Sequence, residues 1–163
     1  HLSKTLSLTS KISPGAISRK RRNTWHSAEE VHAHFLSKKV FARWDPQVLN
    51  DYVLYGTHEE KTDEGVQRVL SFDRNIETQI YNSVPHNLER LLKKYPLACP
   101  VSLVAARHSN EMRLAGFDFS QKVTKGRICT IDGTHLVPME KPMVTAAAIE
   151  ASILNMLSLK ASK

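Results

Sequence analysis

Apolar side chains in the first half of the chain recur at helical spacing, which predicts a series of short helices. The first is expected from Ala28, because Ala28, Val31 and Phe35 fall on one face. Ser27 and Glu30 stand three residues apart, the spacing of a capping box, in which a serine and a glutamate satisfy free backbone amides. This pattern predicts a helix that begins directly after Ser27.

Three more segments of this half combine helical spacing with capping or breaking residues: 45–55, 76–81 and 88–95. Asp45 and Pro46 are typical of a helix start, and Gly56 is typical of a helix end. Residues 57–65 are polar and charged and predict a loop, whereas residues 66–72 predict a short extended segment.

The pattern changes after Pro100. Residues 101–106 and 127–132 are short apolar runs bounded by turn residues, which is typical of strands buried on both faces of a parallel sheet. Residues 111–125 between them are expected to form the crossover. Residues 144–159, preceded by Pro142, predict a long apolar helix that packs on the sheet.

These elements indicate the α/β class, with a helical lid followed by two parallel strands and a C-terminal helix. We expect a basic irregular segment over 1–24, a helical lid over 25–97 and core elements over 98–163. Two parallel strands make a poor sheet by themselves, so an incomplete sheet is expected.

Composition and charge narrow the function classes. Apolar residues make up 41% of the 163 residues, no run is long enough to cross a membrane, and no signal peptide is evident. The first residue is His1, so we expect that the natural start lies elsewhere. Cys99 and Cys129 lie in apolar surroundings and predict buried free thiols in a reducing, intracellular compartment.

The net charge of +7 is concentrated near the start of the chain, where six cations precede the first acid: Lys4, Lys11, Arg19, Lys20, Arg21 and Arg22. Such a cluster suits nucleic acid, an anionic membrane surface, or simple exposure to solvent. No aromatic residue is interleaved with these charges, so nucleic-acid binding is not expected, while peripheral membrane contact stays open.

The clearest chemical signal is His135, which follows the second predicted strand on a loop opened by Gly133. The carboxyl ends of parallel strands are where open α/β sheets place their chemistry. A neutral imidazole takes a proton from a hydroxyl group near pH 7, so the placement predicts a general base. The other histidines and the two cysteines lack ligand spacing, and neither a metal nor a cofactor is expected.

The segment 133–142, GTHLVPMEKP, resembles the stretch around the catalytic histidine of the α/β-hydrolase superfamily. Residues 100–109 resemble its penultimate strand, after which the acid of the catalytic triad usually follows. Segments 19–27, 41–46 and 52–56 resemble the lid of a fungal branch that includes peroxisomal lipase and esterase-like proteins. The resemblance implies that His135 is the catalytic base, that the aromatic residues of the lid pack its core or line an acyl pocket, and that the substrate is a small ester or lipid.

The chain departs from this family in two ways. No Gly-x-Ser-x-Gly occurs, so the nucleophile is expected before His1 and the chain alone is expected to be inactive. Ser109 occupies the usual acid position and cannot stabilise an imidazolium as a carboxylate does. Glu111 is the nearest substitute, Asp118 is a more distant one, and an acid after an earlier strand is the third alternative.

The sequence therefore predicts the C-terminal portion of a serine hydrolase. The alternative is a non-catalytic fragment or an interaction module derived from the same fold. The expected location is the cytoplasm or the peroxisome. The chain ends in Ser162-Lys163, one residue short of a peroxisomal Ser-Lys-Leu signal, so that signal is absent from the sequence as it stands.

Overall fold

The structure is a computed structural model that describes residues 14–83, 87–115 and 117–161. Its described residues fall into two compact units, each made of two stretches of chain. The first unit is drawn from 1–38 and 50–86, and the second from 39–49 and 87–163. The segment 25–97, expected to be one lid, thus contributes to both units, and the boundaries after residues 24 and 97 remain predictions.

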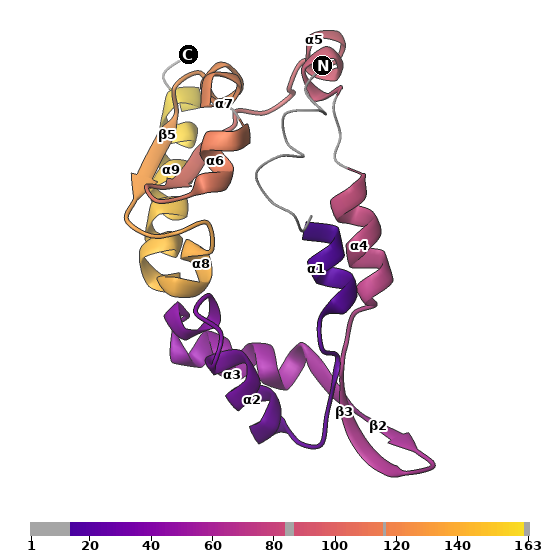
Figure 1. Cartoon of the computed structure of the whole chain (residues 1–163). Coiled ribbons are helices and arrows are strands. Elements are labelled where there is room, and N and C mark those ends of the chain that lie inside the picture. The colour runs from indigo at the N-terminus through magenta and orange to yellow at the C-terminus, as the bar shows by residue number, and fades with distance from the viewer. Residues whose placement is uncertain (1–13, 84–86, 116, 162–163) are drawn as a thin grey trace. The chain divides into compact units, whose positions relative to one another are not determined.

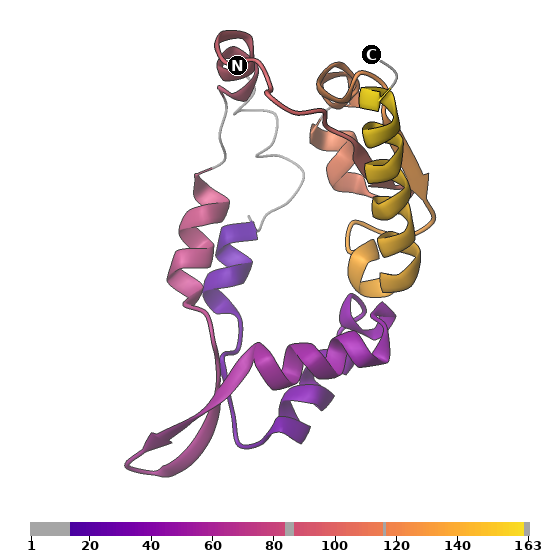
Figure 2. The ribbon, with the colours of Figure 1, turned by 180° about the vertical axis from the view of Figure 1, so that it is seen from behind.

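Besides a shared helix, the described part of the first unit contains three helices and three strands: α1 (Pro14–Lys20), β1 (Thr24–Trp25), α2 (Ala28–Leu36), the hairpin β2 (Thr57–Thr62) and β3 (Gly65–Leu70), and α4 (Arg74–Asn82). The shared helix, α3 (Pro46–Tyr55), begins in one unit and ends in the other. The three strands form an antiparallel sheet in the order β1-β3-β2. Helices α1 and α4 lie side by side in Figures 1 and 2.

Two expectations for this unit were wrong. Residues 14–20, expected to be irregular, form α1, because Pro14 opens a helix as readily as it opens a turn. Residues 57–65, expected to be a loop, form β2 and the turn into β3. The strand escaped detection because only Thr57 of its side chains is buried, so no alternation of apolar residues marks it. Gly65 follows the turn with a φ of 126°, which a side chain disfavours.

The helix boundaries of this unit follow from their capping residues. The Ser27 hydroxyl accepts a hydrogen bond from the Glu30 amide at 3.3 Å, as expected. The Glu30 carboxylate reaches one residue further back than in a standard capping box and accepts from the His26 amide at 2.7 Å. At the start of α3, the Asp45 carboxylate accepts from the Gln47 amide at 2.9 Å.

The core of the first unit is aromatic and aliphatic. Trp25 and Phe35 are 1% and 2% exposed, and Val31 is fully buried. Burial of an aromatic side chain on this scale stabilises a fold by about 2–3 kcal/mol. Arg68 of β3 donates to the backbone oxygens of Val53 and Leu54, and so it supplies a positive charge at the carboxyl end of α3.

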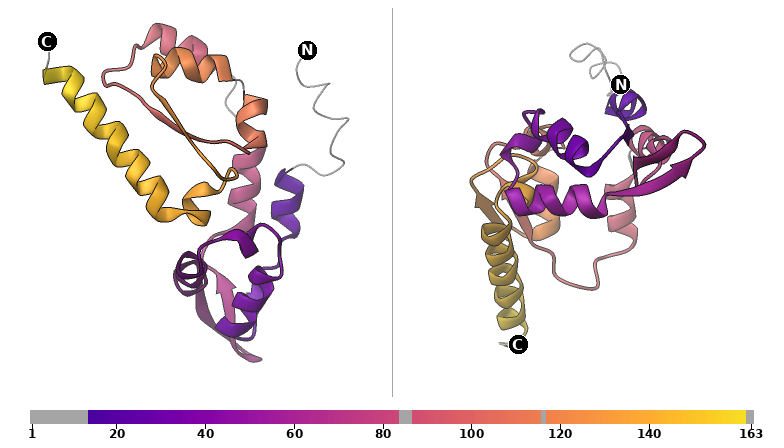
Figure 3. Two further views of the ribbon diagram at one scale, coloured as in Figure 1. Left: turned by 90° about the vertical axis from the view of Figure 1, so that its left-hand side faces the viewer. Right: turned by 90° about the horizontal axis from the view of Figure 1, so that it is seen from below.

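The second unit contains the parallel pair β4 (Leu103–Ala106) and β5 (Ile128–Ile131). Its helices are η2 (Phe41–Arg43), α5 (Leu88–Lys94), α6 (Asn110–Ala115), α7 (Phe117–Thr124), α8 (Val137–Glu140) and α9 (Pro142–Ala161). The strands, the crossover and the long terminal helix are those expected from the sequence. Helix α9 packs on β5 and β4, and it runs unbroken in both views of Figure 3.

Burial in this unit is lower than expected. Of the two strands, only Ala105 is buried, because each strand has the other as its single described partner. Cys99 is exposed, contrary to the expectation, since it lies in the irregular segment before β4. Cys129 is half-buried, and both thiols are free. Apolar side chains on α9 are also open, including Met143 at 79% exposure.

Helix α7 ends in a Schellman motif, in which the Lys125 amide donates to the Lys122 oxygen at 3.3 Å and the Gly126 amide to the Gln121 oxygen at 3.1 Å. Lys125 takes the left-handed conformation, with a φ of 53°, at the position where glycine is preferred. A non-glycine residue there costs about 1–2 kcal/mol. The turn then delivers the chain directly into β5.

Candidate functional site

The candidate site lies on the two loops that follow β4 and β5. The strands are parallel and paired from Leu103 with Ile128 to Ala106 with Ile131, so their carboxyl ends lie at one edge. Beyond the ladder the loops remain joined, because the His108 amide donates to the Gly133 oxygen at 3.0 Å. This pairing brings Ser109 and His135 together from positions 26 residues apart.

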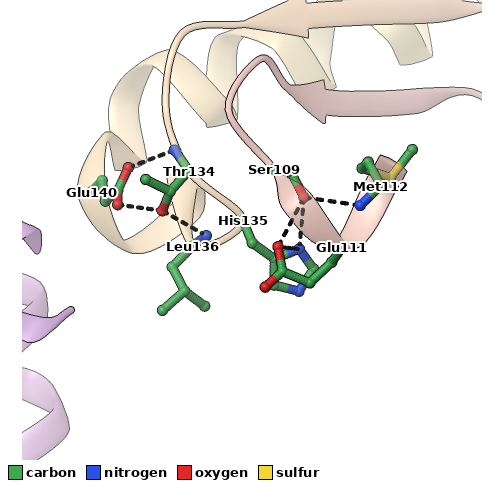
Figure 4. A network of polar contacts seen from close by, with 7 residues as sticks. All are labelled: Ser109, Glu111, Met112, Thr134, His135, Leu136 and Glu140. Atoms are coloured by element: carbon green, nitrogen blue, oxygen red, sulfur yellow. Dashed lines mark hydrogen bonds and ion pairs between the residues drawn. The ribbon is translucent and has the colours of Figure 1, made fainter. Parts of the chain in front are cut away.

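Ser109 is the centre of the site (Figure 4). Its hydroxyl lies 3.3 Å from His135 Nδ1, donates to Glu111 Oε2 at 3.3 Å, and accepts from the Met112 amide at 3.2 Å. The Ser109 residue is 3% exposed, whereas the side chains of Glu111 and His135 are 58% and 56% exposed. A buried serine therefore supports two accessible ionisable groups.

The three contacts of Ser109 can all be satisfied together by one tautomer of His135. A hydroxyl group has one proton to donate and two lone pairs that accept. Its proton goes to Glu111, because an ionised carboxylate only accepts, and one lone pair takes the Met112 amide. In that arrangement the remaining lone pair accepts from His135 when Nδ1 carries the proton, and in this tautomer Nε2 keeps its lone pair.

Ser109 also caps the amino end of α6. It stands directly before α6, and its bond from Met112 is that of an N-cap to the third helical amide. Because Glu111 lies in the first turn of the same helix, the cap fixes the distance from Glu111 to His135: its Oε2 lies 3.9 Å from Nδ1. Glu111 lies two residues after the usual acid position, and Ser109 links it to His135 through its hydroxyl group.

Glu140 holds the histidine loop from the other side. Its two carboxylate oxygens accept from the Thr134 amide at 3.0 Å and from the Thr134 hydroxyl at 2.5 Å. Glu140 thus bonds backward to the residue before His135 (Figure 4). A Cβ on Gly133 would lie 2.5 Å from Val137 Cγ2, so this loop requires a glycine at its start.

A second polar cluster joins the two loops at the surface. Asp132 lies 3.1 Å from His108 Nε2 and 2.9 Å from Lys141 Nζ. The hydrogen bond from Lys141, followed by its charge and by the bond from His108, holds the pKa of Asp132 below its usual value. This cluster could not be predicted from the sequence, because its three members are neither close in sequence nor part of a recognised motif.

The remaining candidates are not brought to the site. Asp118 lies in the first turn of α7 and makes no hydrogen bond or ion pair with His135 among the described contacts.

Metal-ligating side chains do not gather in the described residues. In the segments 14–83, 87–115 and 117–161, no group of three or more such side chains is found. No helix of this part of the chain is long and apolar enough to span a membrane.

The basic cluster near the start is partly neutralised. Arg21 pairs with Glu77 at 3.2 Å, and Arg22 pairs with Glu30 at 2.5 Å while lying 5.6 Å from the Trp25 ring. Lys4 and Lys11 lie outside the described residues. These pairs give Arg21 and Arg22 a role in the fold of the first unit, which weakens the case for a nucleic-acid surface.

Among solved structures, the chain is similar to the crystal structure of E-2-(acetamidomethylene)succinate hydrolase, with a TM-score of 0.62 and 16% sequence identity. The match covers 85% of this chain and 50% of that one, so the chain spans about half the length of the protein it matches. Comparisons with models of protein families and with curated proteins gave no match. The match supports an α/β-hydrolase fold for the chain.

Proposed function

We propose that the chain is the C-terminal part of a serine hydrolase and that His135 is its general base. The observation that supports this proposal is the hydrogen-bond pattern of Ser109. It leaves a proton on His135 Nδ1 and a lone pair on Nε2, which is the form that accepts a proton from a hydroxyl group. The exposure of the imidazole leaves Nε2 open to a reaction partner.

The proposed reaction is the hydrolysis of an ester or lipid by the longer protein, whose other part would supply the nucleophilic serine. As that serine attacks the ester carbonyl carbon, Nε2 of His135 takes the hydroxyl proton. The imidazolium returns the proton to the leaving alcohol as the carbon–oxygen bond breaks. A water molecule, deprotonated in turn by Nε2, releases the acid and restores the serine.

Glu111 is the proposed acid, and it acts through Ser109. The serine dipole orients His135, while the Glu111 carboxylate polarises the serine and attracts the imidazolium at 3.9 Å. Both charged side chains are more than half exposed, so solvent screens this attraction. We therefore propose that Glu111 stabilises the imidazolium less than a carboxylate bonded directly to the imidazole would.

The resemblance to the fungal lipase and esterase-like branch favours a small-molecule ester or lipid substrate and a location in the cytoplasm or peroxisome. The aromatic residues of the lid were expected either to pack its core or to line an acyl pocket. Trp25 and Phe35 are buried in the core of the first unit. Phe41 and Trp44 stack with ring centroids 4.6 Å apart in the second unit and are half-buried. The second pair is the better candidate for contact with an acyl chain.

His135→Ala in the longer protein tests the proposed base. Loss of a triad member reduces kcat by about 10⁴- to 10⁶-fold, so hydrolysis of a chromogenic short-chain ester should fall to near background. His58→Ala is the matched control, because His58 lies on β2 and bonds to Ser71. It should change turnover by less than about twofold. Activity within tenfold of the parent in His135→Ala would refute the assignment.

Glu111→Gln tests the acid. The amide keeps the shape of the side chain and removes the charge that stabilises the imidazolium, so kcat should fall by about 10- to 100-fold with little change in KM. Asp118→Asn is the control, since Asp118 occupies the equivalent place in the first turn of α7. An equal loss in both variants, or no loss in Glu111→Gln, would assign the acid to another part of the protein.

A second candidate function, that of an interaction module, is favoured by the open apolar side chains of α9. Met143, Leu154 and Leu157 are 79%, 59% and 57% exposed, and apolar side chains in such numbers on one helix favour a covering partner. A fluorophosphonate probe distinguishes the two functions in the longer protein. Covalent labelling of a serine supports the hydrolase, and its absence with an intact fold supports the module.

A further inference from the structure

A cavity of about 560 Å³ lies in the second unit, away from the candidate site. It is formed by the segment between α5 and β4, one face of α7, and the turn from α7 into β5. These segments precede the amino ends of the two parallel strands, whereas Ser109 and His135 follow the carboxyl ends. The four-residue strands separate the two places by about 13 Å.

The wall of this cavity is apolar along one part. Five aliphatic or aromatic side chains contribute to it: Leu92, Leu97, Val101, Phe119 and Val123. Leu97 is 46% exposed, and the others are half-buried. Cavities of this size and composition are typical of sites for small organic molecules.

The other part of the wall is cationic. Lys93, Lys122, Lys125 and Arg127 line the cavity together with a single acid, Glu89. Glu89 pairs with Lys93 at 3.1 Å along α5. Over the part of the chain that the structure describes, no carboxylate forms an ion pair with Lys122, Lys125 or Arg127, which leaves three uncompensated positive charges beside an apolar wall.

Two of these cations have distinctive backbone environments. Arg127 Nε donates to the Val101 oxygen at 3.0 Å, which fixes the guanidinium against the cavity wall. Lys125 occupies the left-handed position of the Schellman motif, where glycine would be more stable. Lys125 therefore adds a positive charge to the cavity wall at a position whose backbone favours glycine.

We infer that this cavity binds an amphiphilic anion, that is, a molecule with an apolar chain and an anionic head group. The apolar wall takes the chain, and Lys122, Lys125 and Arg127 take the head group. Binding at this place does not depend on His135 or on any nucleophile, so it stands apart from the proposed hydrolase function.

Cys99 provides a direct measurement, because it lines the cavity and its thiol is free and exposed. Decanoate, decyl phosphate and the neutral 1-decanol are added to the complete chain, and alkylation of Cys99 by N-ethylmaleimide is followed by mass spectrometry. We expect at least one of the two anions to slow Cys99 alkylation by about tenfold or more, with little effect from the alcohol. The two anions together identify whether a carboxylate or a phosphate head group is preferred. Half-buried Cys129 is the internal control, and its rate should not change.

Lys125→Gly separates a role in binding from a role in folding. It relieves the left-handed lysine, so the melting temperature should stay equal or rise, while the affinity for the protecting anion falls about tenfold. Lys61→Gln, an exposed lysine on β2, should change neither quantity. Protection should also weaken as salt rises from about 0.05 to 0.5 M, because the head group is held by charge.

Protection by 1-decanol equal to that by the anions would overturn the inference, as would the absence of protection by both anions. Unchanged affinity in Lys125→Gly would overturn the role of the cationic wall. Because Cys99 alkylation requires no turnover, these outcomes are independent of whether His135→Ala abolishes ester hydrolysis.

Discussion

At the scale of single residues, the candidate site depends on side chains that use their full hydrogen-bonding capacity. With one hydroxyl group, Ser109 caps α6 and contacts both Glu111 and His135 Nδ1. Glu140 uses both oxygens on Thr134. Since these contacts arise from loops that follow parallel strands, a change in either loop alters the geometry of the imidazole.

Gly133→Ala tests the closeness of this packing. The added Cβ would lie 2.5 Å from Val137 Cγ2 and 3.3 Å from Glu140 Oε2, and Val137 is buried. We expect a loss of about 1–3 kcal/mol in the free energy of unfolding, measured with urea. Combined with Val137→Ala, the loss should be smaller than the sum of the two single losses, because the double variant removes the clash. Strict additivity would contradict the predicted contact.

At the scale of elements, capping residues and short apolar runs located several helices and strands correctly. Capping residues located the starts of α2 and α3, and apolar runs located β4, β5 and α9. Strand β2 was missed, because an exposed polar strand is specified by pairing with β3 and has no periodic signal of its own. His135 and Glu111 were proposed from the sequence as base and acid, and these roles stay predictions. The contacts of both residues with Ser109 depend on two loops meeting in space.

The same substitution should have opposite effects in two helices. Ser27→Ala removes the cap of α2 and should cost about 1 kcal/mol. Ser152→Ala lies inside α9, where the hydroxyl bonds to the Ala148 oxygen of the preceding turn, and alanine is the better helix former. We expect Ser152→Ala to be neutral or to stabilise by a few tenths of a kcal/mol. Chemical denaturation of both variants, followed by circular dichroism, decides the sign of each effect.

At the scale of the whole molecule, stability should depend on pH through groups in different environments. Burial, followed by the charges of Lys38 and Arg22, holds the pKa of His34 below 6.5. The pKa of Glu30 lies below 4.5, first because it accepts from the His26 amide and then because it bonds to Arg22. In both cases the unfolded chain binds protons more readily than the folded one, so stability rises with pH.

The His34 contribution is fully present above about pH 6.5 and is lost as pH falls from there through its folded pKa, whereas the Glu30 contribution is lost only below about pH 4.5. The urea midpoint should therefore be lower at pH 5.5 than at pH 7.5. His34→Gln should reduce that difference and leave the loss below pH 4.5 in place. An unchanged difference in His34→Gln would assign the upper transition to another histidine.

The interleaving of the two units along the chain has a consequence for synthesis. The Asp45 amide of the second unit donates to the Met139 oxygen at 2.8 Å, and about 90 residues separate the end of the segment 39–49 from that partner. At about 5–20 residues per second, a ribosome needs roughly 5–20 s to cover that interval. During that time all residues of the first unit are synthesised. Phe41, Trp44 and Leu49 belong to the second unit, which is not yet complete. Nascent chains halted within this window should accordingly recruit chaperones that recognise aromatic segments.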